Sequence, residues 1–135
     1  MNYPIDEIEG IGPSFGEKLK AAGVNNTGDL LNTCCDKKGR DGLAASSGIS
    51  YDLLLKWANR ADLMRINGVG KQFSELLENA GVDTVKELAT RRADNLTAKM
   101  EEVNAEKKLA RTTPKQDQVE GWIAEAKTMD PIITH

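Results

Sequence analysis

The sequence is poor in the residues from which catalytic and metal sites are usually built. It has a single histidine, His135, and only two cysteines, Cys34 and Cys35, which are adjacent in the chain. A disulfide between adjacent residues is strained, and a metal site would need further ligands, so we expect reduced thiols with at least one in the core. The serines have no histidine to activate them as nucleophiles. We therefore expect neither an enzyme nor a side-chain metal site.

Aromatic residues and long apolar runs are also scarce. Aromatic residues make up 4% of the chain, and no stretch alternates apolar and polar residues for long, so strands are not expected. No apolar run approaches the roughly 20 residues of a membrane span, and the acidic start MNYPIDEIEG differs from a secretory signal. These absences predict a cytoplasmic protein without a membrane partner. The formal net charge of −3 removes the simplest argument for nucleic-acid binding, which is a basic chain.

Signals for the starts and ends of helices are, in contrast, frequent. Pro13 suits the first position of a helix, and Gly23 can end that helix in the left-handed conformation. The pattern predicts an all-α fold with about seven or eight helices. Four polar residues are expected to be N-caps: Asn26, Ser50, Thr84 and Thr113. Pro114 follows the last of them and would take the first helical position.

Apolar stripes indicate which helix faces are buried. Trp57 and Trp122 both lie on such stripes, so we expect them to pack in the core rather than to stack on bases. A weaker amphipathic helix is expected in a charged region within the second half of the chain. With 39% hydrophobic residues in 135, the chain is large enough for one compact domain with a single core. The apolar positions of the weaker helix are Leu96, Met100, Val103 and Leu109.

The chain contains an internal repeat. Residues 8–30 align without gaps on residues 66–88 at an offset of 58, with ten identities in 23 positions. The identities fall on turn glycines and on core positions together, which chance does not easily produce. Both copies place a Gly-x-Gly turn ahead of a helix, in IEGIG and in INGVG. The repeat therefore predicts two similar structural segments.

Each turn is expected to leave its backbone accessible. Glycine permits positive φ, and the helix that follows begins with outward-pointing amides that carry a partial positive charge. Such a turn can receive a phosphate oxygen without a basic side chain. Neither copy has the third glycine and the preceding strand of a dinucleotide site, and GVGKQ lacks the Gly-Lys-Ser or Gly-Lys-Thr of a phosphate loop.

IEGIGPSFGEKLKAAGV and INGVGKQFSELLENAGVDTVKEL resemble helix-hairpin-helix motifs, especially those in the N-terminal domains of recombinases related to the strand-exchange ATPases. They are also similar to the paired motifs of Holliday-junction-binding and repair proteins. Nearly the whole chain resembles a small bacterial family of tandem helix-hairpin-helix proteins without an assigned function. The resemblance implies hairpins packed about a pseudo-twofold axis that contact DNA backbone in repair or recombination, sometimes with a monovalent cation at hairpin carbonyls. Some relatives use the same turn only to pack against protein.

Charge separates the two hairpins as candidate DNA contacts. Residues 1–33 hold five acids and two bases, a net charge of −3, and Pro13 removes an amide donor, so packing or a protein contact is favoured at the first hairpin. Basic residues surround the second hairpin in the sequence. Two interpretations of them stay open: they form a patch that contacts DNA, or they are ordinary solvated charges. The candidate DNA-binding residues are Arg65, Asn67, Gly68, Val69, Gly70, Lys71, Arg91 and Arg92, and those of the first hairpin are Gly10, Ile11, Gly12 and Ser14.

The expected function is non-enzymatic, sequence-independent binding of the DNA phosphate backbone through hairpin amides. The alternative is an interaction or scaffold module whose protein partner meets the acidic first hairpin or the C-terminal helices. For the two charged helices beyond the paired motif, one interpretation is that Trp122 closes the core of the duplicated segment. Within one domain over 1–135, the expected parts are a first hairpin repeat at 1–33, a connecting helical segment at 34–50, a second repeat at 51–92 and C-terminal helices packing on the repeats at 93–135.

Overall fold

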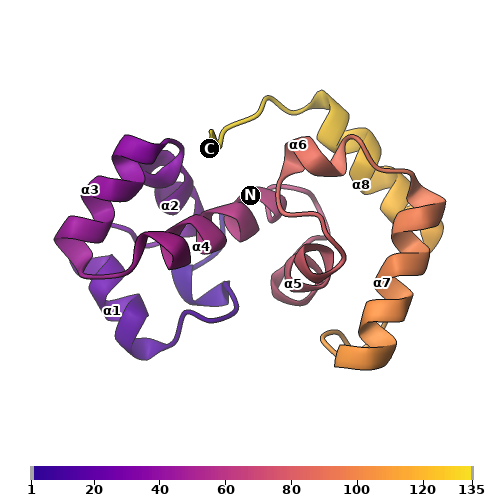
Figure 1. Ribbon diagram of the computed structural model, residues 1–135, viewed down its shortest axis with the longest axis horizontal. Coiled ribbons are helices and arrows are strands. Elements are labelled where there is room, and N and C mark those ends of the chain that lie inside the picture. Colours follow the sequence, from indigo (N-terminus) through magenta and orange to yellow (C-terminus); the bar gives the residue numbers. More distant parts are fainter. Residues whose placement is uncertain (1, 135) are drawn as a thin grey trace.

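The computed structural model describes residues 2–134, and over that range the chain is helical with no strand. A short 3-10 helix, η1 (Ile5–Glu7), is followed by eight α-helices (Figure 1). The expected all-α class and the expected number of helices are confirmed. The helices are α1 (Pro13–Ala21), α2 (Thr27–Cys34), α3 (Lys37–Ser47), α4 (Tyr51–Leu63), α5 (Lys71–Asn79), α6 (Val85–Leu88), α7 (Ala93–Lys107) and α8 (Gln116–Thr128).

Local sequence explains where most of these helices begin and end. The side chains of Asn26, Ser50 and Thr84 each accept a hydrogen bond from the amide three residues later, which satisfies a donor that the helix leaves free. α1 starts at Pro13, as expected, because a first helical residue needs no N–H. Gly23 follows α1 with a φ of +88°, the left-handed geometry that stops a helix.

Two expectations for the C-terminal helices are wrong. α8 begins at Gln116 rather than at Pro114, and no side chain caps it, so Thr113 is not its N-cap. Pro114 is buried ahead of the helix, where packing holds it outside the helical turn. α7 ends before Leu109 because Lys108 adopts a φ of +52°, and Leu109 packs against the core from the loop.

The described residues form two hydrophobic clusters where a single core was expected. One cluster draws mainly on η1 to α4 and the other mainly on α5 to α8, because each run of helices buries its apolar faces against itself. Trp57 is 1% exposed in the first cluster and Trp122 is 4% exposed in the second, which confirms their expected place in the core. Cys34 is also buried in the first cluster, and this burial raises the pKa of its thiol to about 11.

Each cluster belongs to a run of four α-helices in the same order, which we call the first unit (η1 to α4) and the second unit (α5 to α8). α1 and α5 both follow a Gly-x-Gly turn, and a glycine with positive φ follows both. Trp57 of α4 packs on Phe15 with ring centroids 5.2 Å apart, and Trp122 of α8 packs on Phe73 at 5.3 Å. α4 and α8 therefore correspond, and α7 and α8 complete the second unit.

The backbone passes between the two units twice. α4 leads directly into the second glycine turn, and Leu63 near its end belongs to the second cluster. Beyond α8 the chain crosses back to the first unit (Figure 1), where Ile133 is buried in the first cluster and the Thr134 amide donates to the carbonyl of Cys35 at 2.7 Å. The relative position of the two glycine turns is therefore constrained from both sides.

Gly68→Ala is expected to lower the free energy of unfolding by about 1–3 kcal/mol, because it forces a residue with a side chain into a sparsely populated backbone region. The φ of Gly68 is +89°, and a Cβ there would lie 3.3 Å from Nε1 of Trp122. Gly70→Ala is the matched control, since Gly70 has a φ of −107° and open space where a Cβ would lie. Urea denaturation of both variants checks the prediction, and equal losses of stability would contradict it.

Candidate functional site

Gly10 and Gly68 give the two turns a backbone geometry that favours glycine. Their φ angles are +96° and +89°. Both glycines are exposed, whereas the next residue of each turn, Ile11 or Val69, is buried. The amide of that buried residue donates to the carbonyl three residues earlier at 3.1 Å in both turns. Each turn therefore presents backbone on its outside and is anchored by an apolar side chain beneath.

A tryptophan closes the inner side of each turn. A Cβ at Gly10 would lie 3.3 Å from Nε1 of Trp57, and a Cβ at Gly68 would lie 3.3 Å from Nε1 of Trp122. Both tryptophans come from the last helix of their own unit, α4 or α8. Since the indole fills the inner side, only the outer side of each turn can meet a partner.

A second side chain from the same helix fixes the residue that precedes each glycine. Arg60 of α4 donates from Nη1 to the carbonyl of Glu9 at 2.7 Å. Glu125, at the corresponding position of α8, accepts from the amide of Asn67 at 3.1 Å and 3.3 Å through its two carboxylate oxygens. The same position thus holds both turns with opposite chemistry, a cation on a carbonyl and a carboxylate on an amide.

α1 and α5 begin with amide groups that have no acceptor among residues 2–134. The N-cap of each helix is a glycine, which has no side chain to accept from them. α5 presents three such amides, those of residues 71–73, and Lys71 and Gln72 are exposed. α1 presents only two, those of residues 14–15, because Pro13 has no N–H. The second turn is accordingly the better donor.

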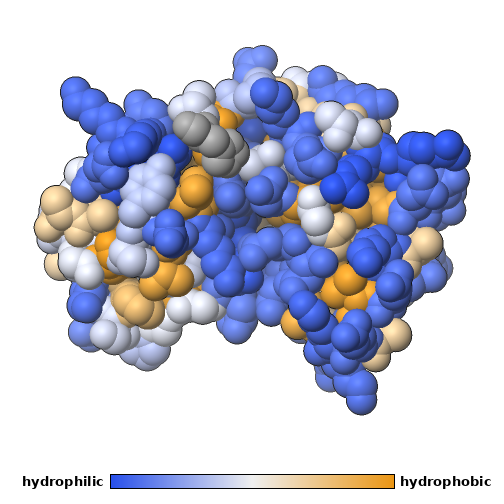
Figure 2. All heavy atoms as spheres, viewed as in Figure 1, coloured by the Kyte–Doolittle hydropathy of each residue, from blue (hydrophilic) through white to orange (hydrophobic). Residues whose placement is uncertain are grey.

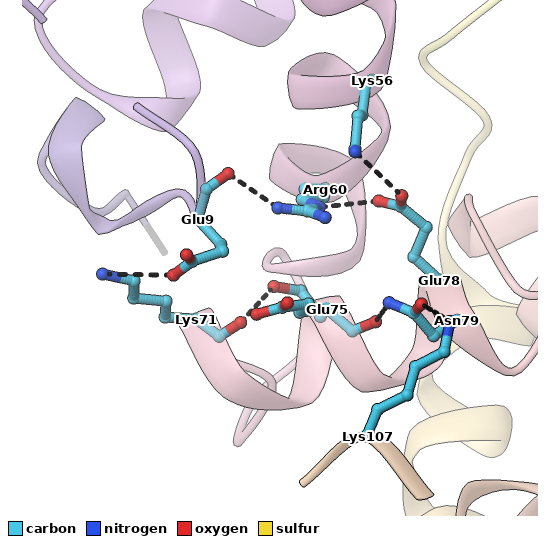
Figure 3. Close-up of polar contacts among 9 residues, drawn as sticks. Glu9, Lys56, Arg60, Lys71, Glu75, Glu78, Asn79 and Lys107 are labelled. Atoms are coloured by element: carbon cyan, nitrogen blue, oxygen red, sulfur yellow. Dashed lines mark hydrogen bonds and ion pairs between the residues drawn. The ribbon is translucent and has the colours of Figure 1, made fainter. Parts of the chain in front are cut away.

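An ionic network holds the two turns beside each other (Figure 3). Lys71 Nζ at the start of α5 lies 3.5 Å from the carboxylate of Glu9 in the first turn. Arg60, only 5% exposed, also donates to Glu78 of α5 at 2.6 Å. Burial, followed by the charge of Glu9, raises the pKa of Glu75 in the same network. The junction between the units is therefore rich in acids, and the cations that face them are Lys71, Arg60 and Lys56, whose Nζ lies 4.0 Å from Glu78.

Arg65, a predicted DNA contact, neutralises a buried acid. Its Nη2 lies 2.9 Å from the carboxylate of Asp62 and donates to the carbonyl of Asp130 at 3.2 Å. Asp62 is 2% exposed, and its other oxygen accepts from the amide of Val85 at 2.8 Å. Burial raises the pKa of Asp62 despite these partners. Arg65 thereby joins α4 and the end of the chain, and it is not a free surface cation.

The structure does not bring Arg91 and Arg92 to the second turn. Arg91 donates to the carbonyl of Gly81 at 2.9 Å, beyond the end of α5 that is opposite the turn. A helix of this length, nine residues, spans about 13 Å. Arg91 also pairs with Glu87 at 3.0 Å, and Arg92 pairs with Asp94 at 2.9 Å. Among the basic candidates, only Lys71 starts the helix behind the turn.

No local sequence pattern marks Arg60 and Glu125 as turn contacts, although both contact the turns. Their partners are 51 and 58 residues away, so no local pattern could indicate them. The two tryptophans are the feature of the sequence from which this correspondence could have been found. Aligning Trp57 with Trp122, an offset of 65, also aligns Arg60 with Glu125 and extends the repeat to the last helix of each unit.

The structure defines an all-helical protein of two four-helix units whose glycine turns lie side by side. Residues 9–129 match the family described as Domain of unknown function (DUF4332), and the chain belongs to this family. The match runs from the first turn to just beyond α8, so it includes α1 to α8 and omits only η1 among the helices of residues 2–134. Neither the curated proteins nor the solved structures compared with the chain contain a match. Within residues 2–134, every helix is too short or too polar to traverse a bilayer.

Glu75→Gln is expected to stabilise the fold at neutral pH and to have little effect in acid. Because folding raises the pKa of Glu75 above its usual 4.5, the carboxyl favours the folded state while protonated, and this contribution is lost as pH rises through the folded pKa. A neutral glutamine avoids that loss. The free energy of unfolding, measured in urea from about pH 3.5 to about pH 7, should therefore diverge from wild type as pH rises.

Glu17→Gln is the matched control, because Glu17 has the same place in the repeat and is exposed on α1. It should change the free energy of unfolding little at any pH in this range. Parallel pH profiles for the two variants would show that burial at the junction does not affect Glu75.

Proposed function

We propose that the protein contacts the DNA phosphate backbone, without sequence specificity, through the amides of its paired glycine turns. One observation carries the proposal: the two turns lie side by side, and each leads into a helix whose first amides have no acceptor among residues 2–134. Such amides, reinforced by the helix dipole, bind phosphate oxygens. The resemblance of both turns to helix-hairpin-helix motifs supports the same function.

The second turn makes the main contact in this proposal. Gly68 and Gly70 allow a phosphate to approach the backbone, and Val69 holds the turn from beneath. Lys71, whose side chain is 46% exposed, exchanges Glu9 for a phosphate oxygen. The amide of Asn67 is available only when its carboxylate partner moves away.

The first turn contributes less. Gly10, Gly12 and Ser14 are exposed and Ile11 is buried below them, but Pro13 removes one donor. Arg65 has no part in the contact because it is held by the buried Asp62, and Arg91 and Arg92 have none because they lie beyond the far end of α5.

Binding by this surface is expected to be weak. Phosphate must compete with carboxylates at the turns, and each close pair of like charges costs about 0.5–1 kcal/mol at a wet surface. The net charge of −3 adds no long-range attraction. With three or four phosphates neutralised, log K should fall with log salt with a slope of about −3.

The test is fluorescence anisotropy of labelled single-stranded, duplex and branched DNA over a salt series. Wild type should bind duplex at low salt, and Lys71→Glu should weaken that binding by about tenfold or more, because it places a carboxylate where the phosphate would lie. Lys38→Glu makes the same change of net charge on α3, in an exposed position of the first unit, and should weaken binding less. Absence of binding at low salt, or equal effects of the two variants, would count against the proposal.

The second candidate function is a protein-interaction module. The observation that favours it is that the cations of the predicted DNA surface are neutralised within the molecule, at Arg65, Lys71, Arg91 and Arg92. Affinity purification after nuclease treatment separates the two candidates. A protein partner retained without DNA, together with no DNA binding in the salt series, would favour this second function.

A further inference from the structure

Residues 130–134, which we call the tail, pack on the first unit, along a path from the end of α4 to the junction between α2 and α3 that we call the groove of the tail. At one end of the groove, Arg65 donates to the carbonyl of Asp130 at 3.2 Å. At the other end, Thr134 donates from its amide to Cys35 at 2.7 Å and accepts from Nη2 of Arg40 at 2.7 Å. The groove therefore holds a non-helical peptide through its backbone, with a guanidinium at each end.

An apolar side chain and a buried cation complete this groove. Ile133 is 8% exposed within the first cluster. Arg40 is fully buried, and its remaining donors go to the carbonyl of Cys34 and the hydroxyl of Tyr51, both at 2.9 Å. The tail thus follows a path from the end of α4 to the junction between α2 and α3.

At the corresponding place in the second unit, residues 2–134 leave a groove uncovered. A cleft of about 550 Å³ lies between the α6–α7 junction, at Arg91 and Arg92, and one face of α8. Gln116, at the α8 position that corresponds to Tyr51 of α4, marks one end of the cleft, and Lys127 marks the other. The helices beside the two places also differ in length, since α6 has four residues where α2 has eight.

The cleft combines an apolar floor with a mixed, mainly basic rim. Ile123, 6% exposed, lies at its floor beside Ala93 and Ala124. The charged lining residues are three bases and two acids, Arg91, Arg92, Lys127, Asp94 and Glu120, a net charge of +1 on a protein whose net charge is −3. On the half of the molecule that contains α5 to α8, hydrophobic atoms are visible between hydrophilic ones (Figure 2).

We infer that this cleft binds an extended peptide segment of a partner protein. An apolar side chain of the peptide packs on Ile123, its backbone carbonyls face Arg91 and Arg92, and an acidic residue lies at Lys127. The way the first unit holds the tail supplies the template for this binding. The inference does not depend on DNA binding, because the residues that line the cleft include none of the residues of the two glycine turns.

A peptide fits this cleft better than a polyphosphate or a nucleic acid. Asp94 and Glu120 line it and would repel phosphate, and both arginines already have a carboxylate partner on one side. Peptide carbonyls are neutral, so they can accept from the guanidinium groups without displacing those carboxylates. The apolar floor, in turn, favours binding of a β-branched or similar apolar side chain, because the contact buries apolar surface.

The probe is a fluorescein-labelled synthetic peptide with the sequence MDPIIT, which is that of residues 129–134 and carries one acid and two isoleucines. Its anisotropy with the full-length protein should rise to saturation. Ala124→Trp should weaken binding by about tenfold, because the indole occupies the cleft, and Lys127→Glu should weaken it by about threefold or more. Both positions are exposed on α8, so circular dichroism and the melting temperature should remain close to wild type.

The matched controls are Ala105→Trp, on an exposed position of α7, and Lys38→Glu, on α3. Both should leave peptide affinity within about twofold of wild type. A peptide with both isoleucines replaced by serine should bind at least about tenfold more weakly. Absence of binding by MDPIIT overturns the inference, and so does binding that Ala124→Trp leaves unchanged, since the peptide would then occupy another place such as the groove of the tail.

Discussion

The packing of a tryptophan against each glycine turn is the constraint on which the rest of the structure depends. Trp57 under Gly10 and Trp122 under Gly68 tie the last helix of each unit to its first. Truncating a buried tryptophan typically costs about 3–5 kcal/mol, so this contact is a large share of what holds a unit of this size together. It also orients the turn, because backbone amides can point only away from the indole.

Corresponding positions of the two units have kept their mechanical role while reversing their charge. Arg60 holds the first turn by its carbonyl, and Glu125 holds the second by its amide. The consequence for anion binding is unequal. The second turn has more free amides at its helix start, yet a carboxylate already satisfies the amide before its glycine. The acid-rich junction of Glu9, Glu75 and Glu78 also absorbs the nearby cations, which keeps the protein's surface from forming a strong positive patch.

The two units also differ in the grooves beside α4 and α8. The first is filled by the end of the chain, through Arg40 and Ile133, and the second is a cleft with Ile123 at its floor. Two units with one architecture therefore present different surfaces. A duplicated fold can divide its roles in this way: residues 130–134 occupy the groove of one copy and connect the units, whereas residues 2–134 leave that of the other copy uncovered.

Much of the fold follows from the sequence, because helix ends depend on neighbouring residues. Asn26, Ser50 and Thr84 cap helices in the expected places, since a cap acts over three residues. The expectation failed at Thr113 and Leu109, where burial of Pro114 and the left-handed Lys108 decided the boundary. A single core was also expected, because hydrophobic content does not show how apolar faces are divided.

Sequence alone determined the helical class, the repeat and the glycines of both turns, because these depend on local backbone geometry and on periodicity. Tertiary structure decided which charges are free. Folding brings an acid to each of three groups that the sequence alone leaves unpaired. Lys71 pairs with Glu9, Arg65 pairs with Asp62, and the amide of Asn67 donates to Glu125. The strength of a charged site depends on every charge within a few ångströms, and a linear sequence does not contain those distances.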